Sequence, residues 1–143
     1  MKYIFLIVSI WLVSACTAIM GIDPQTTGFF SNTTVSPVVG AVEIPAQSWF
    51  PQSYANVKTC VVAHGAKIRS KAPAYNDIHY FTTPGVFYVD NGIPLIGWSW
   101  GHTITMAQTW FSPQLVEHEM AHLVTGEWGH PSKFWLDCGW LIF

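Results

Sequence analysis

Charge is scarce in this chain of 143 residues. Only 10% of the residues are charged, six are Lys or Arg, and the formal net charge is −2. Nucleic-acid binding needs clustered cations that face the phosphate backbone, and the sequence contains no such Lys/Arg cluster. We therefore expect no nucleic-acid partner.

The apolar run at the N-terminus is also short. Residues 3–13, which follow the positive charge of Lys2, are fewer than the roughly 20 residues that a helix needs to cross a bilayer. A short apolar run with a positive start and small residues at its end is typical of a signal peptide.

Residues 13–16, Val-Ser-Ala-Cys, close this run and resemble the lipobox of bacterial lipoproteins. The resemblance implies a signal peptide over residues 1–15, with Cys16 lipidated as the first mature residue and the chain anchored in the bacterial envelope. Thr17 stands where an Asp would favour inner-membrane retention, so outer-membrane sorting is expected if the cell is Gram-negative. The alternatives are secretion after cleavage near Ala15 or Ala18, and an uncleaved anchor helix.

Residues 16–45 are rich in Thr, Ser, Gly and Pro and carry almost no charge. This composition is typical of a tether between an anchor and a domain. Residues 46–143 are then expected to form one domain with a modest core.

Cys60 and Cys138 are the other two cysteines of the mature chain. In an oxidising compartment they favour a disulfide. Two buried free thiols are the alternative, and Cys138 as a zinc ligand is a weaker one.

The pattern of apolar residues and turn signals predicts several strands before one long helix. The expected strands are residues 57–63, for which a short helix is the alternative, and residues 78–81, 86–89, 93–100 and 102–107. The fold class is therefore α+β, with a mostly antiparallel sheet packed on a buried helix.

That helix carries His118-Glu119-x-x-His122, the HExxH signature. Residues four apart lie on one helix face, so His118 and His122 are able to bind one metal ion. Glu119 reaches a water beside that metal without being a ligand, which is the role of a general base. Ser112 and Pro113 before the motif predict a helix start, and Gly126 after it predicts the end.

The motif and the preceding strands resemble the zincin metallopeptidases. The resemblance implies a Zn²⁺ cofactor, peptide or protein substrates, and an edge strand that binds substrate in extended form. Residues 102–108 are the first candidate for this strand, and residues 93–100 are the second.

The third zinc ligand is expected to be His130. The helix ends at Gly126, a turn-prone segment follows, and Pro131 favours an extended backbone at His130. Asp137 and Glu127 are the second and third choices, or they accept hydrogen bonds from the ligand histidines.

Two functions of different classes follow. The first is a lipid-anchored zinc hydrolase of peptide or amide bonds, in which Glu119 is the catalytic base. The second is a non-catalytic envelope lipoprotein that binds a partner and keeps a structural or vestigial metal. For the first, His102, His79 and Tyr80 are candidates by residue type for stabilising an oxyanion, although each has a structural role as its simpler explanation.

Overall fold

The computed structural model describes residues 36, 38–89, 92–130 and 133–140. Cys16, the expected signal peptide and most of the expected tether lie outside this part of the chain. Among the described residues, no helix combines the length and the apolar character needed to cross a membrane.

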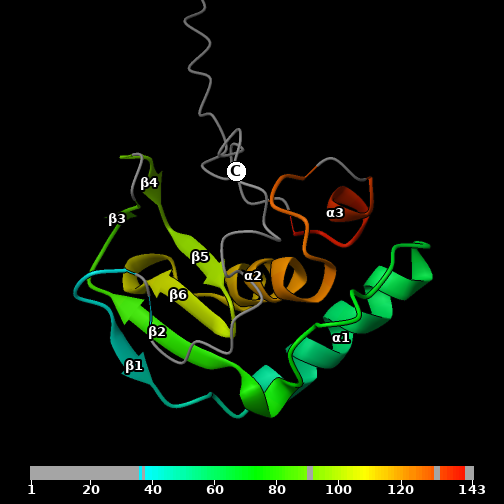
Figure 1. Cartoon of the computed structure of the whole chain (residues 1–143), viewed down its shortest axis with the longest axis horizontal. Coiled ribbons are helices and arrows are strands. Elements are labelled where there is room, and N and C mark those ends of the chain that lie inside the picture. The colour runs from blue at the N-terminus through cyan, green and yellow to red at the C-terminus, as the bar shows by residue number, and fades with distance from the viewer. Residues whose placement is uncertain (1–35, 37, 90–91, 131–132, 141–143) are drawn as a thin grey trace, which may run out of the picture.

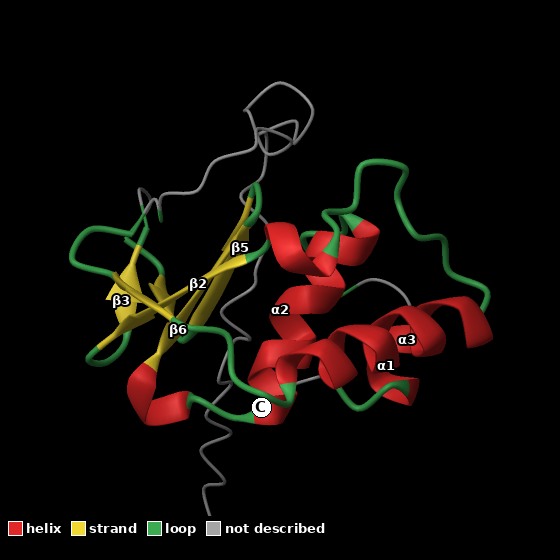
Figure 2. Ribbon diagram, turned by 90° about the horizontal axis from the view of Figure 1, so that it is seen from below, coloured by secondary structure: helices red, strands yellow, loops and turns green. Residues whose placement is uncertain are grey.

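A sheet and a group of helices form two layers (Figures 1 and 2). The helices are α1 (Phe50–Ala63), α2 (Pro113–Thr125) and α3 (Phe134–Asp137), with short 3-10 helices at Tyr75–Asp77 and Gln108–Trp110. The strands are β1 (Val42–Ile44), β2 (His79–Thr83), β3 (Phe87–Tyr88), β4 (Pro94–Leu95), β5 (Gly97–Trp100) and β6 (Thr103–Ala107). The expected α+β class is confirmed at this level.

The main sheet has the order β1-β2-β6-β5, and β3 pairs separately with β4. β1 with β2 and β6 with β5 are antiparallel, whereas β2 and β6 are parallel. The sheet is therefore mixed, with two antiparallel pairings and one parallel pairing. β1 lies inside residues 16–45, so the sheet begins within the range expected to be a tether.

Four of the five expected strands are confirmed in substance. Residues 78–81 and 102–107 correspond to β2 and β6, and β3 occupies the centre of residues 86–89. The segment 93–100 divides into β4 and β5. The sequence Asp90-Asn91-Gly92 also predicts a turn after β3, but Asp90 and Asn91 lie outside the described residues.

The strand expected at residues 57–63 is wrong and its helical alternative is right, because this segment is the second half of α1. Phe50, Tyr54, Val57 and Val61 are buried at spacings of four, three and four, which is the stripe of a helix packed on one side. The β-branched valines suggested a strand, but burial of this stripe outweighs their local preference.

β6 was the first candidate for a substrate-binding edge strand, and the topology contradicts this. It lies between β2 and β5 and is paired on both sides. Among the described strands, β5 is the one at the sheet edge beside α2, and it belongs to the second candidate segment.

The main core fills the space between the sheet and the helices. Its members are apolar residues of α1, α2, β2 and β6, together with Phe134, Trp135 and Trp140 of the C-terminal segment. A disulfide between Cys60 and Cys138 joins α1 to the end of α3. The disulfide thereby fixes the C-terminal segment to α1, which packs against the HExxH helix α2.

Candidate metal centre

Local signals in the sequence define both ends of α2. The Ser112 hydroxyl accepts a hydrogen bond from the Leu115 amide at 3.2 Å, and Pro113 occupies the first turn. Gly126 has φ 77°, a left-handed conformation that suits glycine at a helix end. Nine of the thirteen helical residues are buried, including His118, Glu119 and His122. The motif is thus on a rigid helix inside the protein.

The imidazoles of His118, His122 and His130 converge at one point. Nε2 of His118 lies 3.2 Å from Nε2 of His122 and 3.3 Å from Nε2 of His130. One ring nitrogen from each histidine lies within 4.8 Å of the other two. His118 and His122 come from one face of α2, and His130 comes from the segment that follows Gly126.

Backbone carbonyls hold the opposite nitrogens of two of these rings. Nδ1 of His118 lies 2.5 Å from the Trp140 carbonyl oxygen, and Nδ1 of His122 is bonded to the Glu127 carbonyl oxygen. A carbonyl oxygen only accepts, so each Nδ1 carries the proton. In the neutral rings, both Nε2 atoms then present lone pairs, which is the tautomer that a metal ligand needs.

Burial keeps these rings neutral. It lowers the pKa of His118 to about 4, against the opposing effect of the Trp140 hydrogen bond. Burial and the neighbouring His118 lower the pKa of His122 well below its ordinary value. Burial also lowers the pKa of His130.

The donor set therefore fits a zinc ion. The lone pairs of His118 Nε2 and His122 Nε2 face each other inside the protein, and a cation between them removes this repulsion. Catalytic zinc sites usually have three protein ligands and an open fourth position, and three histidines are one such ligand set. Trp135 packs on the cluster, with ring centroids 5.4 Å from His118, 4.6 Å from His122 and 4.6 Å from His130.

Glu119 lies directly beside the cluster and is only 2% exposed. Its Oε1 is 4.0 Å from Nε2 of His118, and its Oε2 accepts a hydrogen bond from the Ser99 hydroxyl at 2.7 Å. Burial raises the pKa of Glu119 to about 8, and the Ser99 hydrogen bond acts in the opposite direction. A cation at the three histidines would also favour the charged carboxylate.

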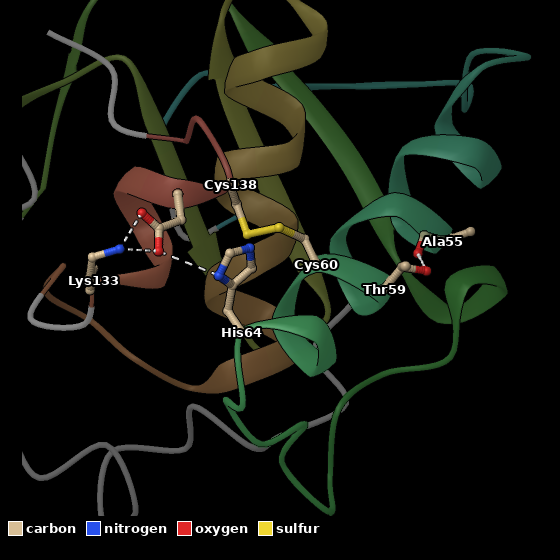
Figure 3. The surroundings of a disulfide bond; sticks show 7 residues. Ala55, Thr59, Cys60, His64, Lys133 and Cys138 are labelled. Carbon is tan, nitrogen blue, oxygen red and sulfur yellow. Dashed lines mark hydrogen bonds and ion pairs between the residues drawn. A yellow bond between two sulfur atoms is a disulfide. The ribbon is translucent and has the colours of Figure 1, made fainter.

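Asp137, the second choice for the third ligand, lies elsewhere. Its carboxylate forms an ion pair with Lys133 at 2.7 Å and approaches Nδ1 of His64 at 3.4 Å (Figure 3). The Lys133 hydrogen bond lowers the pKa of Asp137. The structure therefore brings His130, and not Asp137, to the HExxH histidines.

Glu127 supports the cluster without joining it. Its backbone carbonyl binds His122, and its side-chain Oε2 accepts a hydrogen bond from Trp135 Nε1 at 2.9 Å. This matches the expected alternative, in which Glu127 is an acceptor for a ligand histidine, except that the backbone oxygen performs the role.

The three residues considered for oxyanion stabilisation have contacts of other kinds. Nδ1 of His79 pairs with Glu43 at 2.8 Å, and the His102 carbonyl accepts from the His79 amide. The Tyr80 ring packs on Phe50, and burial raises the pKa of its hydroxyl.

The cysteines form a second group of donor atoms. Cys60, His64 and Cys138 present atoms within 4.8 Å of one another. The two sulfurs are bonded to each other, which removes them from metal binding. Figure 3 shows this disulfide linking α1 to the C-terminal segment, with His64 beside it.

Ser99, Gly97, Trp135 and Trp140 contribute to the site but are not identified by the sequence analysis. The residue types of Ser99 and Gly97 do not indicate a functional site, and neither does the main-chain carbonyl of Trp140. Each of the three contacts Glu119 or His118, from which it is separated by 20 or more positions in the sequence. Trp135, five residues after His130, offered the clearest missed signal, because a large apolar residue close to a ligand often shields it.

Comparisons with known proteins add no family assignment. No protein-family model, curated protein or solved structure gives a significant match to this chain. The functional argument therefore depends on the geometry of the site.

Proposed function

We propose that this protein is a zinc-dependent hydrolase of peptide or amide bonds, similar in its site to the zincins and anchored in the bacterial envelope through Cys16. The observation that carries the proposal is the convergence of three histidine Nε2 atoms beside the buried carboxylate of Glu119. Zn²⁺ is the proposed cofactor, and His118, His122 and His130 are its proposed ligands.

When bound, zinc supplies Lewis acidity that polarises a carbonyl oxygen and lowers the pKa of a water molecule. Glu119 accepts a proton from water as the water oxygen forms a bond to the carbonyl carbon of the substrate. Glu119 then delivers this proton to the leaving nitrogen as the C–N bond breaks. The carbonyls of Trp140 and Glu127 hold the His118 and His122 rings in the required tautomer throughout.

The test compares Glu119→Gln with Glu117→Gln in the full chain purified in detergent. Glu117 is half-buried on the same helix and serves as the matched control. We expect equimolar zinc in the wild-type protein and in both variants. Hydrolysis of a quenched fluorescent peptide library should be lost in Glu119→Gln alone. Wild-type activity in the Glu119→Gln variant would refute Glu119 as the base.

A second candidate function is a non-catalytic lipoprotein that acts by binding a partner. It is supported by the burial of the cluster, because His118 and His122 are each only 4% exposed. Under this proposal the wild-type protein contains equimolar zinc, hydrolyses nothing in the library, and uses the metal for stability.

A further inference from the structure

Strand β5 lies directly against the carboxylate of Glu119. Gly97 and Ser99 are two residues apart, so both face the same side of the sheet, and both are buried. They pair with Met106 and Ile104 of β6, whose side chains belong to the main core. This side of β5 therefore faces α2, whereas Trp98 belongs to the opposite side.

Gly97 is required by the position of Glu119. A Cβ atom at residue 97 would lie 2.2 Å from Oε1 of Glu119, 2.8 Å from its Cδ, and 2.9 Å from Cδ1 of Leu115. These distances are shorter than non-bonded atoms adopt. Gly97 does not have a positive φ angle, so its backbone conformation is open to other residues. Glycine is needed here because a side chain would collide with Glu119 and Leu115.

Ser99 fixes the other oxygen of the same carboxylate. Its hydroxyl donates a hydrogen bond of 2.7 Å to Oε2, while Oε1 lies 4.0 Å from Nε2 of His118. A buried carboxylate needs such a partner, and a charged acceptor makes the bond stronger than a neutral one. Ser99 thus holds Oε2, whereas Oε1 lies between Gly97 of the same strand and His118 of the cluster.

We propose that Gly97 and Ser99 are positioning residues, which hold the Glu119 carboxylate with Oε1 directed to the three-histidine cluster. Ser99 prevents the carboxylate from rotating, and Gly97 leaves the space that Oε1 occupies. This role rests on the proposed function, because it concerns the residue that acts there as the base.

The first experiment measures kcat, KM and zinc content for Ser99→Ala, Ser99→Thr and Thr59→Ala. Ser99→Ala should lower kcat by about 10- to 100-fold, the effect of losing a hydrogen bond to a charged group, with KM and zinc content unchanged. Ser99→Thr keeps the hydroxyl and should restore most of kcat. Thr59→Ala removes an exposed hydroxyl that bonds to Ala55 of the same helix, α1, and it should leave kcat at the wild-type level.

Gly97→Ala is the companion variant. It should lower kcat at least as strongly as Ser99→Ala, because the new methyl group displaces Oε1. If Gly97→Ala does not fold, the Ser99 series still decides the proposal.

A second experiment needs no catalysis. It measures the unfolding equilibrium constants of the zinc-free full chain for wild type, Ser99→Ala, Glu119→Ala and the double variant. The double variant should change the unfolding equilibrium constant by less than the product of the two single changes, because both substitutions remove the same contact. Independent effects, or a Ser99→Ala variant with wild-type kcat, would overturn the positioning role.

The two experiments also separate this inference from the proposed function. If the wild-type protein hydrolyses no peptide, the hydrolase proposal and the catalytic part of this role both fail. A non-multiplicative result in the zinc-free chain then shows that the contact between Ser99 and Glu119 is real but serves the structure alone.

Discussion

Nδ1 of His118 lies 2.5 Å from the carbonyl oxygen of Trp140, although 22 residues separate them along the chain. Trp140 follows Cys138 by two residues, and Cys138 is bonded to Cys60 of α1. The orientation of a proposed zinc ligand therefore depends on a segment that the disulfide ties to α1.

The disulfide should influence both stability and metal binding. Replacing Cys60 and Cys138 together by Ala should lower the free energy of unfolding by about 4–5 kcal/mol, because an unfolded chain without this long loop has more entropy. The affinity for zinc should fall as well, since the Trp140 carbonyl is held less firmly. Urea denaturation and competition with a zinc chelator measure the two effects.

The wild-type protein treated with a thiol reductant is the control for this double variant. Reduction should reproduce both losses. A lower stability combined with wild-type zinc affinity would show that the disulfide does not support the metal centre.

Removal of one histidine should identify the third ligand. Loss of a hydrogen bond that supports a metal ligand weakens metal binding by about 10- to 100-fold. His130→Ala removes a ligand itself and should therefore weaken zinc binding by more than this. Asp137→Asn should bind zinc as the wild type does, because Asp137 pairs with Lys133 and His64. Zinc stoichiometry after dialysis against a weak chelator distinguishes them, and zinc loss in Asp137→Asn would contradict the assignment.

Trp135 should contribute to the metal centre through its indole N–H. Trp135→Phe keeps an aromatic ring on the cluster but removes the hydrogen bond to Glu127. We expect a loss of about 1–2 kcal/mol in the free energy of unfolding and a zinc affinity about 10-fold lower.

Trp110→Phe is the matched control for that change, because Trp110 is 50% exposed whereas Trp135 is fully buried. Thermal denaturation and zinc titration of the two variants should differ clearly. Equal behaviour would remove Trp135 from the set of supporting residues.

The N-terminal cap of α2 should have a measurable energy. Ser112→Ala leaves the Leu115 amide without its acceptor and should cost about 1 kcal/mol in the zinc-free protein. Ser70→Ala, at an exposed turn, should cost less than half of that. Urea denaturation measures both, and equal losses would show that the cap adds nothing.

The helix with the motif was predictable because its signals are local. Ser112, Pro113 and Gly126 each act within one turn of the helix, and the HExxH spacing needs only helical geometry. For residues 57–63 the strand was preferred to the helical alternative because Val57, Val61 and Val62 have a local preference for strands. The burial of Val57 and Val61 on one side of the helix is decided by contacts with distant segments, whereas Val62 is 61% exposed.

The rest of the candidate site depends on contacts between residues that are far apart in the sequence. Ser99 reaches Glu119 only because β5 lies beside α2, and the sequence does not reveal that packing. The parallel pairing of β2 with β6 was likewise not predicted, because the hydrophobic pattern of a strand does not specify the direction of its neighbour. His130 was predicted because the end of α2 limits where the following residues are able to go.

Cys60 and Cys138 are 78 positions apart, and the covalent loop that they close contains all three histidines of the cluster, together with Glu119. A peptide bond cut anywhere inside this loop therefore leaves two pieces that remain joined by sulfur. Nicked protein should migrate as one species on a gel without reductant and as two with it. In a compartment rich in proteases, this arrangement lets a damaged chain keep its histidines together until the disulfide itself is broken.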